Sequence, residues 1–303
     1  MWNKQPCWRN PVLGMALILA LTPTAARRAA GSDGGSESPA AAGGRSLAEL
    51  NSSPIQDNSF LVEEAYNQED GVIQHISMFQ RLPTGDWAFT ETDEWPLRSA
   101  KHQLSLTLAA TQAMGYPNAG AGWGDTFVNY RYQLVGNGDT RLAVAPRISL
   151  LIPTGNPVYG RGMGGAGLQL SLPVSIVLNQ HIATHWNVGT TWVPRAQNDL
   201  HQGASSLGAN LGQSVVWMVN NRFNALLETV WTSTPQVAAP GITTPQHNLY
   251  ISPGVRWSHN FKNGLQIVPG VGLPVAVGPN AGHLGMIFYL SFEHGLDFAH
   301  SKH

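Results

Sequence analysis

The residues best placed to do chemistry are a histidine and a serine two positions apart, His75 and Ser77. In an extended strand both side chains leave the same face, close enough for the imidazole to act as a general base toward the hydroxyl. A carboxylate would have to orient that imidazole, and the candidates are Glu63, Glu64 and Glu91. The alternative is a histidine that is satisfied by water or by a carboxylate. We favour this alternative, because the apolar alternation around the pair is weak, and we expect no enzyme activity.

Other signatures of catalysis or cofactor binding do not occur in the sequence. It contains no HExxH, no G-x-S-x-G and no Cys and His residues at metal-ligand spacing. Residues 160–167 include G-x-G, but this run leads from a loop into a predicted strand. Phosphate binding needs the N-terminus of a helix instead. We therefore expect a flexible glycine-rich loop, no cofactor and no metal.

The charge balance excludes nucleic acid as a partner. The chain has 17 basic and 18 acidic residues, a net charge of -1, and no basic block that could hold phosphates. Charged residues make up 12% of the chain, about half the share usual in soluble domains, and Gly, Pro and uncharged polar residues replace them. Beyond the amino terminus no apolar run is long enough for a membrane-spanning helix. This composition is typical of a membrane β-barrel.

The amino terminus predicts export. Two basic residues, an apolar run over 12–21 and small residues at 24–26 are the parts of a signal peptide, which we assign to 1–26. The alternative is a buried first helix. The only cysteine, Cys7, lies in this segment, so the exported chain would have none. Residues 27–57, rich in Gly, Ser and Ala, predict a flexible periplasmic leader.

Residues 58–72 separate this leader from the first predicted strand. Phe60–Tyr66 has the pattern of a short amphipathic helix, which could enter a barrel mouth as a plug or lie outside the barrel. A tail over 295–303 follows the last predicted strand.

Residues 73–294 repeat one unit, an alternating segment followed by a turn or loop. Between 168 and 178 every second residue is apolar, which puts one continuous apolar face on a strand long enough to cross a bilayer obliquely. Connections alternate between short turns and longer loops such as 194–206 and 233–246, as in outer-membrane barrels with both termini in the periplasm. The predicted strands are 73–81, 87–97, 102–110, 125–134, 140–152, 165–178, 182–193, 207–219, 222–232, 247–258, 264–276 and 284–294.

The two faces of these strands predict an all-β, antiparallel, up-and-down transmembrane barrel of about twelve strands. A soluble β-sandwich or lipocalin-like calyx would bury the apolar face. The polarity of the opposite face instead fits an inverted barrel, with lipid outside and water inside. Trp and Tyr collect at membrane interfaces. The aromatic residues expected there are Tyr130, Tyr132, Trp186, Trp192, Trp217, Trp231, Trp257 and Phe288.

The polar face should line the lumen. The arginines on it are expected to oppose Glu228, with Glu91 or Asp93 as further partners, and either bridge across the interior or form a charged selectivity filter. We favour bridging. Twelve strands allow either a narrow channel or a plugged lumen. The predicted lumen residues are Asn129, Arg131, Gln133, Arg147, Gln169, His185, Glu228 and Arg256.

Several strand motifs resemble one family. They are NSFLVEEAYNQEDGVIQHIS (58–77), GDTFVNYRYQL (124–134), APRISLLIPTG (145–155), GLQLSLPVSIVL (167–178) and HWNVGTTWVPRA (185–196). They resemble the outer-membrane transporter family named after the meta-pathway of phenol degradation. The resemblance implies a barrel with a passive transport or channel role and suggests aromatic cargo. Separately, the His75 and Ser77 pair resembles that of outer-membrane lipid deacylases, in which the pair faces lipid.

We therefore expect a passive transporter or channel for small molecules, aromatic or otherwise apolar, in the outer membrane of a Gram-negative cell, reached by export through the periplasm. Its expected partners are outer-membrane lipid, the barrel-assembly machinery and the cargo. Two alternatives stay open: a lipid-modifying enzyme built on His75 and Ser77, and a structural or adhesive barrel that conducts nothing.

Overall fold

A computed structural model describes residues 54–82, 85–116, 120–261, 265–278, 281 and 283–295. The predicted signal peptide, nearly all of the predicted leader and the tail after residue 295 lie outside these residues. Within the described part of the chain, no helix is long and apolar enough to cross a membrane.

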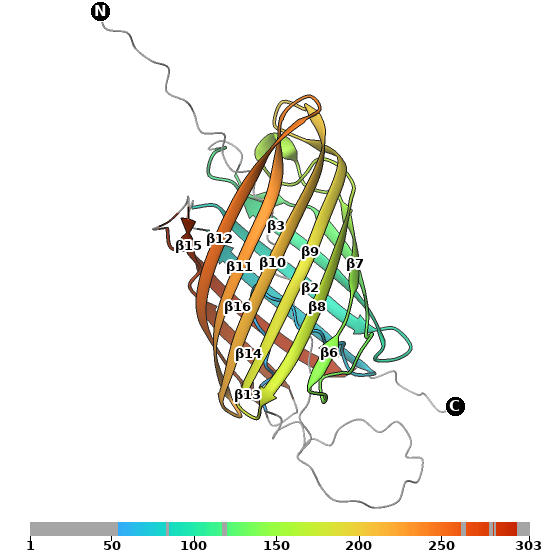
Figure 1. Cartoon of the computed structure of the whole chain (residues 1–303), viewed down its shortest axis with the longest axis vertical. Helices are drawn as coiled ribbons and strands as arrows, with labels where there is room; N and C mark the ends of the chain where they lie inside the picture. The colour runs from blue at the N-terminus through green and yellow to red at the C-terminus, as the bar shows by residue number, and fades with distance from the viewer. Residues whose placement is uncertain are drawn as a thin grey trace, which may run out of the picture.

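Twelve long antiparallel strands, counted over the described residues, close into one barrel (Figure 1). Consecutive long strands pair with each other, and the last strand returns to the first, where Val72 lies opposite Gly295. The predicted fold is therefore confirmed. The long strands are β1 (Val72–Arg81), β2 (Trp87–Pro96), β3 (His102–Gln112), β5 (Thr126–Tyr132), β7 (Arg147–Ile152), β8 (Gly167–Asn179), β9 (Ile182–Gln197), β10 (Gly203–Asn220), β11 (Phe223–Ala239), β12 (Ile242–Trp257), β14 (Gln266–Gly272) and β16 (Met286–Gly295).

Four short strands and one 3₁₀ turn complete the described elements: β4 (Gly122–Trp123), β6 (Leu142–Val144), β13 (His259–Asn260), β15 (Val275–Val277) and η1 (Pro157–Tyr159). Two of the short strands come from predicted segments that prolines interrupt. Pro146 separates β6 from β7, and Pro274 separates β14 from β15, because proline has no backbone N–H to donate to a ladder.

Two of the predicted long loops are wrong. β9 extends to Gln197 and β10 begins at Gly203, so most of 194–206 is strand. The β11–β12 hairpin turns within residues 240–241, and the remainder of 233–246 is paired strand. These extensions are rich in Ser, Thr, Gln and Pro and therefore lack the apolar alternation that marks a strand in the sequence.

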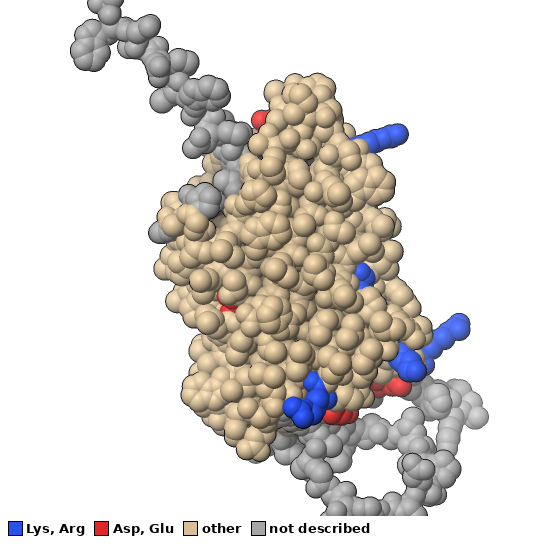
Figure 2. Space-filling view, in the orientation of Figure 1, with Lys and Arg blue, Asp and Glu red and all other residues tan. Residues whose placement is uncertain are grey.

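The strands alternate between a polar interior and an apolar exterior. In β7, Arg147, Ser149 and Leu151 are buried, whereas Ile148 and Leu150 are 43% and 51% exposed. The face drawn in Figure 2 carries few Lys, Arg, Asp and Glu atoms, and most of them lie near its lower end. The barrel wall thus presents a largely apolar belt with few charged residues outward and mostly polar side chains inward.

Candidate functional site

Residues 54–71, here termed the inner segment, precede β1, and residues 55–68 of this segment lie inside the barrel rather than beside it. Phe60 through Tyr66 are all at most 5% exposed. The helix expected over these residues is absent, and the chain there consists of bends and irregular backbone. The reason is that side chains on the barrel wall, and not a helix of its own, satisfy the segment's backbone groups.

The inner segment begins at the barrel end that carries the β10–β11 turn. The Ile55 backbone N–H donates to the carbonyl of Asn221 in the β10–β11 turn, at 2.8 Å. The Asn224 amide donates to the carbonyl of Gln56 at 2.6 Å. The segment later leaves the interior at the start of β1, where the backbone N–H of Gln68 donates to Gln103 at 2.7 Å. It is therefore tied to the wall at both of its ends.

Glu228 on β11 holds the middle of the inner segment. Its Oε1 accepts the backbone N–H groups of Phe60, Leu61 and Val62 at 3.1, 2.6 and 3.0 Å. Glu228 itself is fully buried. One carboxylate oxygen thus fixes three consecutive peptide groups, which is how an irregular backbone can be buried without unsatisfied donors.

Two arginines of the wall meet a carboxylate of the inner segment. Arg131 on β5 donates to Glu63 at 2.9 Å, and Arg147 on β7 lies 3.6 Å from the other oxygen of Glu63. Arg131 also lies 3.7 Å from Glu94 on β2 and donates to the side chain of Asn67 at 3.0 Å. These groups form a buried ionic network between wall and segment.

The third arginine contacts the segment through its backbone. Arg256 on β12 donates to the carbonyl of Asn58 at 2.7 Å, and its guanidinium lies 4.9 Å from the ring centre of Tyr289. Among the described residues no ion pair joins these arginines to Glu228, and most of their partners belong to the inner segment, with Glu94 of the wall as a further one. Glu91 and Asp93 also fall outside the interior, because they alternate with the buried residues of β2.

The remaining predicted lumen residues face the interior. Gln133 donates to the carbonyl of Ala65 at 2.8 Å, and His185 contacts Asp57 O at 2.9 Å. Asn129 donates to Ser105 at 3.1 Å, while Gln169 accepts from Arg147 at 2.6 Å. Further wall residues that hold the segment and were not predicted include Gln103, Ser175 and Asn224. Each alternates with outward-facing neighbours along its strand, as the predicted residues do.

An apolar contact adds to these hydrogen bonds. Phe60, Leu61 and Val62 pack with the inward residues Ile76 and Met78 in one buried cluster. The ring of Phe60 lies directly against the backbone of Gly254 and Gly270, where an added Cβ would stand 2.5 and 2.7 Å from ring atoms. Glycine on β12 and β14 therefore makes room for Phe60.

Between the inner segment and the barrel end that carries the β9–β10 and β11–β12 hairpins lies a cavity of about 110 Å³. Leu61 is among the residues lining it, together with Phe127, Leu151, Met163 and residues of β9, β10 and β11. Asp125 is the one charged residue among its described lining residues, and it accepts backbone N–H groups from Gly155 and Met163 at 3.1 and 2.7 Å. Burial raises the pKa of Asp125, and these two hydrogen bonds lower it in part.

The aromatic residues predicted at the membrane interfaces lie on the exterior. Trp217 is 56% exposed and Trp192 49%, and both alternate with buried neighbours on their strands. The other exterior aromatics of this set are Tyr130, Tyr132, Trp186, Trp231, Trp257 and Phe288.

His75 and Ser77 also lie on the exterior, but no hydrogen bond joins them. The Nδ1 atom of His75 is 2.6 Å from an oxygen of Asp93, and its Nε2 atom is 3.0 Å from Nε2 of His294. Ser77 instead donates to Glu91 at 2.5 Å. The orienting carboxylate is thus Asp93, and Glu63 and Glu64 lie inside the barrel with the inner segment. Both imidazole nitrogens are engaged, so the ring is not aimed at the hydroxyl.

Solved structures with the same fold are outer-membrane barrels. An outer membrane channel from Pseudomonas putida F1 is similar with a TM-score of 0.51 and 13% identity, over 76% of this chain and 97% of that one. A NanC porin is similar with a TM-score of 0.48 and 8% identity, over 73% and 98% of the two chains. No family model and no curated protein matches the sequence. At this level of identity the likeness concerns the fold.

Proposed function

We propose that the chain is a passive outer-membrane channel for small uncharged molecules, apolar and aromatic ones included, and that the inner segment controls passage. The observation that carries this proposal is the combination of a closed barrel, an apolar exterior and a polar interior that holds the inner segment by hydrogen bonds and ion pairs. Such a wall has its apolar side toward lipid and its polar side toward water. The resemblance to the phenol meta-pathway transporter family supports the same function.

The cavity supports the cargo class. It is lined by Phe127, Leu151, Met163 and Val230 together with Ser, Thr and Asn side chains. The three arginines of the interior are engaged by the inner segment below it. An anion entering the cavity would therefore meet Asp125 and no basic side chain of the described lining, whereas an uncharged molecule would meet apolar contacts and hydroxyl groups.

The inner segment would have to move for cargo to pass. Its residues fill the interior from Glu228 to the barrel end that carries the β10–β11 turn. Polar contacts hold it, and each can be exchanged for contacts with water when the segment shifts. A structural barrel that conducts no solute would not need an interior segment held by exchangeable hydrogen bonds. We therefore favour a channel over a purely structural barrel.

Solute flux into liposomes tests this function. Purified protein reconstituted into liposomes should admit small uncharged solutes faster than protein-free liposomes and faster than it admits anions of equal size. Liposomes that stay sealed to all solutes, with the protein shown to be folded by its heat-modifiable gel mobility, would contradict the channel.

A further inference from the structure

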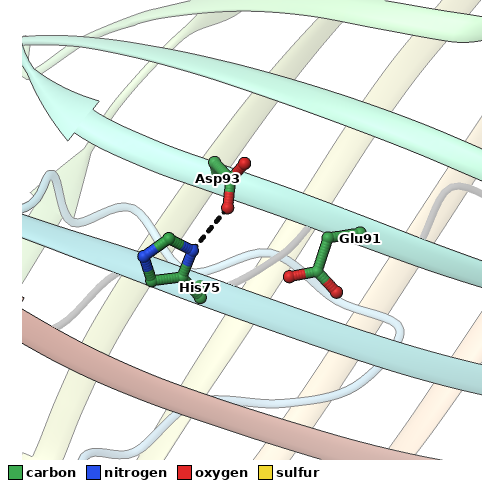
Figure 3. A group of neighbouring side chains, drawn as sticks. All are labelled: His75, Glu91 and Asp93. Atoms are coloured by element: carbon green, nitrogen blue, oxygen red, sulfur yellow. Dashed lines mark hydrogen bonds and ion pairs between the residues drawn. The ribbon is translucent and has the colours of Figure 1, made fainter.

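The exterior of β1 and β2 carries a polar cluster that the channel does not use. His75 leaves β1, and Glu91 and Asp93 leave the adjacent strand β2 on the same side (Figure 3). One ligand atom from each of the three lies within 4.8 Å of the others. We propose that these three side chains bind a divalent transition-metal ion of the zinc class.

Small side-chain rotations would bring the donor atoms to the spacing that such an ion requires. Zinc takes imidazole nitrogen and carboxylate oxygen at about 2.0–2.2 Å, which puts neighbouring ligands of a tetrahedral site roughly 3.3–3.5 Å apart. The Nδ1 atom of His75 and the Asp93 oxygen are 2.6 Å apart, so a modest rotation admits the ion between them. Neither side chain is tightly packed, since His75 is 24% and Asp93 39% exposed.

Neighbouring groups orient these donors. His75 Nε2 lies 3.0 Å from Nε2 of His294 on β16, so the imidazole can donate its Nε2 proton there and keep its Nδ1 lone pair for the metal. The ring also stacks on Phe292, with ring centres 4.8 Å apart. Ser77 donates to Glu91 at 2.5 Å. Metal-binding histidines characteristically donate their second ring N–H to an acceptor that fixes the tautomer and the ring orientation, a role that His294 Nε2 could fill here.

The surroundings of the cluster favour charge neutralisation. Across the strand pairing, Asp93 lies opposite Leu106, Glu91 opposite Leu108 and His75 opposite Phe292. In the membrane position proposed above, this belt contacts lipid, where uncompensated carboxylates are destabilising. Two carboxylates and a neutral imidazole carry two negative charges, and a divalent cation cancels them.

The donor set also selects the ion. Imidazole nitrogen with two carboxylates suits Zn²⁺ and similar transition metals, whereas Mg²⁺ and Ca²⁺ prefer oxygen ligands alone. We therefore expect Zn²⁺ to bind and Mg²⁺ to fail to compete with it.

Calorimetric titration of Zn²⁺ into the purified, tag-free protein in detergent tests the site. The wild type should bind one ion saturably, and Asp93→Asn, Glu91→Gln and His75→Ala should each abolish this binding. His102→Ala is the matched control, because His102 is another exterior imidazole, in contact with Tyr130, and should leave binding unchanged. Heat-modifiable mobility reports the folding of every variant.

X-ray absorption spectroscopy at the zinc edge, carried out on the wild-type protein, keeps the proposal testable if the variants do not fold. It should show one imidazole and oxygen ligands at about 2.0–2.2 Å. Absence of saturable binding by the wild type, or binding that survives Asp93→Asn and Glu91→Gln, would overturn the site. Because binding is measured in detergent without solute flux, its failure leaves the proposed channel function untouched.

Discussion

Arg131 of strand β5 donates to Glu63 of the inner segment at 2.9 Å, and each side chain is only 2% exposed. The pair joins the barrel wall to a segment that belongs to no strand. Arg147 lies 3.6 Å from the same carboxylate, so Glu63 is the common partner of two buried cations. A buried pair of this kind is sensitive to loss of one member, because the other charge is then left without compensation.

Glu63→Ala should therefore release the inner segment from the interior. Removing one partner of a buried ion pair destabilises by about 3–5 kcal/mol, and the arginines regain solvation if the segment leaves. Limited proteolysis of the segment in the folded protein is the measurement, and cleavage should become faster than in the wild type. Asp70→Ala, at the exposed end of the segment, serves as control and should leave the rate unchanged. Equal rates in all three proteins would contradict a holding role for Glu63.

Glu228→Leu should expose the backbone of Phe60, Leu61 and Val62 to exchange. The variant leaves three buried N–H groups without an acceptor. Each unsatisfied donor destabilises the folded state by about 1–3 kcal/mol. Hydrogen–deuterium exchange at these amides should accelerate strongly, and Glu228→Gln, which retains one carbonyl oxygen, should show a smaller acceleration. If both variants keep wild-type protection, the carboxylate does not hold the segment.

Gly254→Val should displace Phe60. A Cβ at position 254 would stand 2.5 Å from a ring atom, and overpacking of this kind destabilises by about 1–3 kcal/mol. Phe60→Ala removes the ring, so the double variant should lose much less stability than the two single changes predict together. Denaturant midpoints of the four proteins measure this coupling, and strict additivity would argue against the contact.

Ile148→Arg should impair barrel assembly, because Ile148 is 43% exposed on the apolar exterior. An arginine on the lipid face near mid-membrane is destabilising by about 2–4 kcal/mol. Arg147→Leu, one residue away, should be milder, since Arg131 still compensates Glu63. Heat-modifiable gel mobility after refolding into lipid compares the two. The opposite ranking would mean that the assignment of inner and outer faces is inverted.

Much of the barrel could be predicted because its signal repeats: one face of each strand is apolar, so alternation in β8 or β16 marks the strand directly. The two strands of the first hairpin were predicted at nearly their observed bounds, but their inward and outward faces could not be assigned from apolar alternation. Ile76 and Met78 face inward against Phe60, while His75 and Ser77 face outward, so the usual apolar-out phase is reversed there. Several wall residues that hold the inner segment, such as Arg131 and Glu228, could be predicted to face inward, but their pairing with the segment could not, since hydrogen bonds from side chains to irregular backbone follow no period in the sequence.

The pairing of His75 with Asp93 illustrates the same limit. The two residues face each other only through the β1–β2 register, which depends on where the hairpin turns and not on a fixed motif spacing. A sequence search for metal ligands at standard spacings therefore passes over them.

The most direct test of the account locks the inner segment to the wall. Ser59 Oγ donates to Ser214 Oγ on β10 at 2.6 Å, so Ser59→Cys with Ser214→Cys should form a disulfide, and Cys7→Ser removes the native cysteine. Solute flux into liposomes is then measured before and after reduction. We expect low flux in the oxidised protein and a rise to the wild-type rate on reduction. Equal flux in the locked and reduced states would contradict passage controlled by this segment.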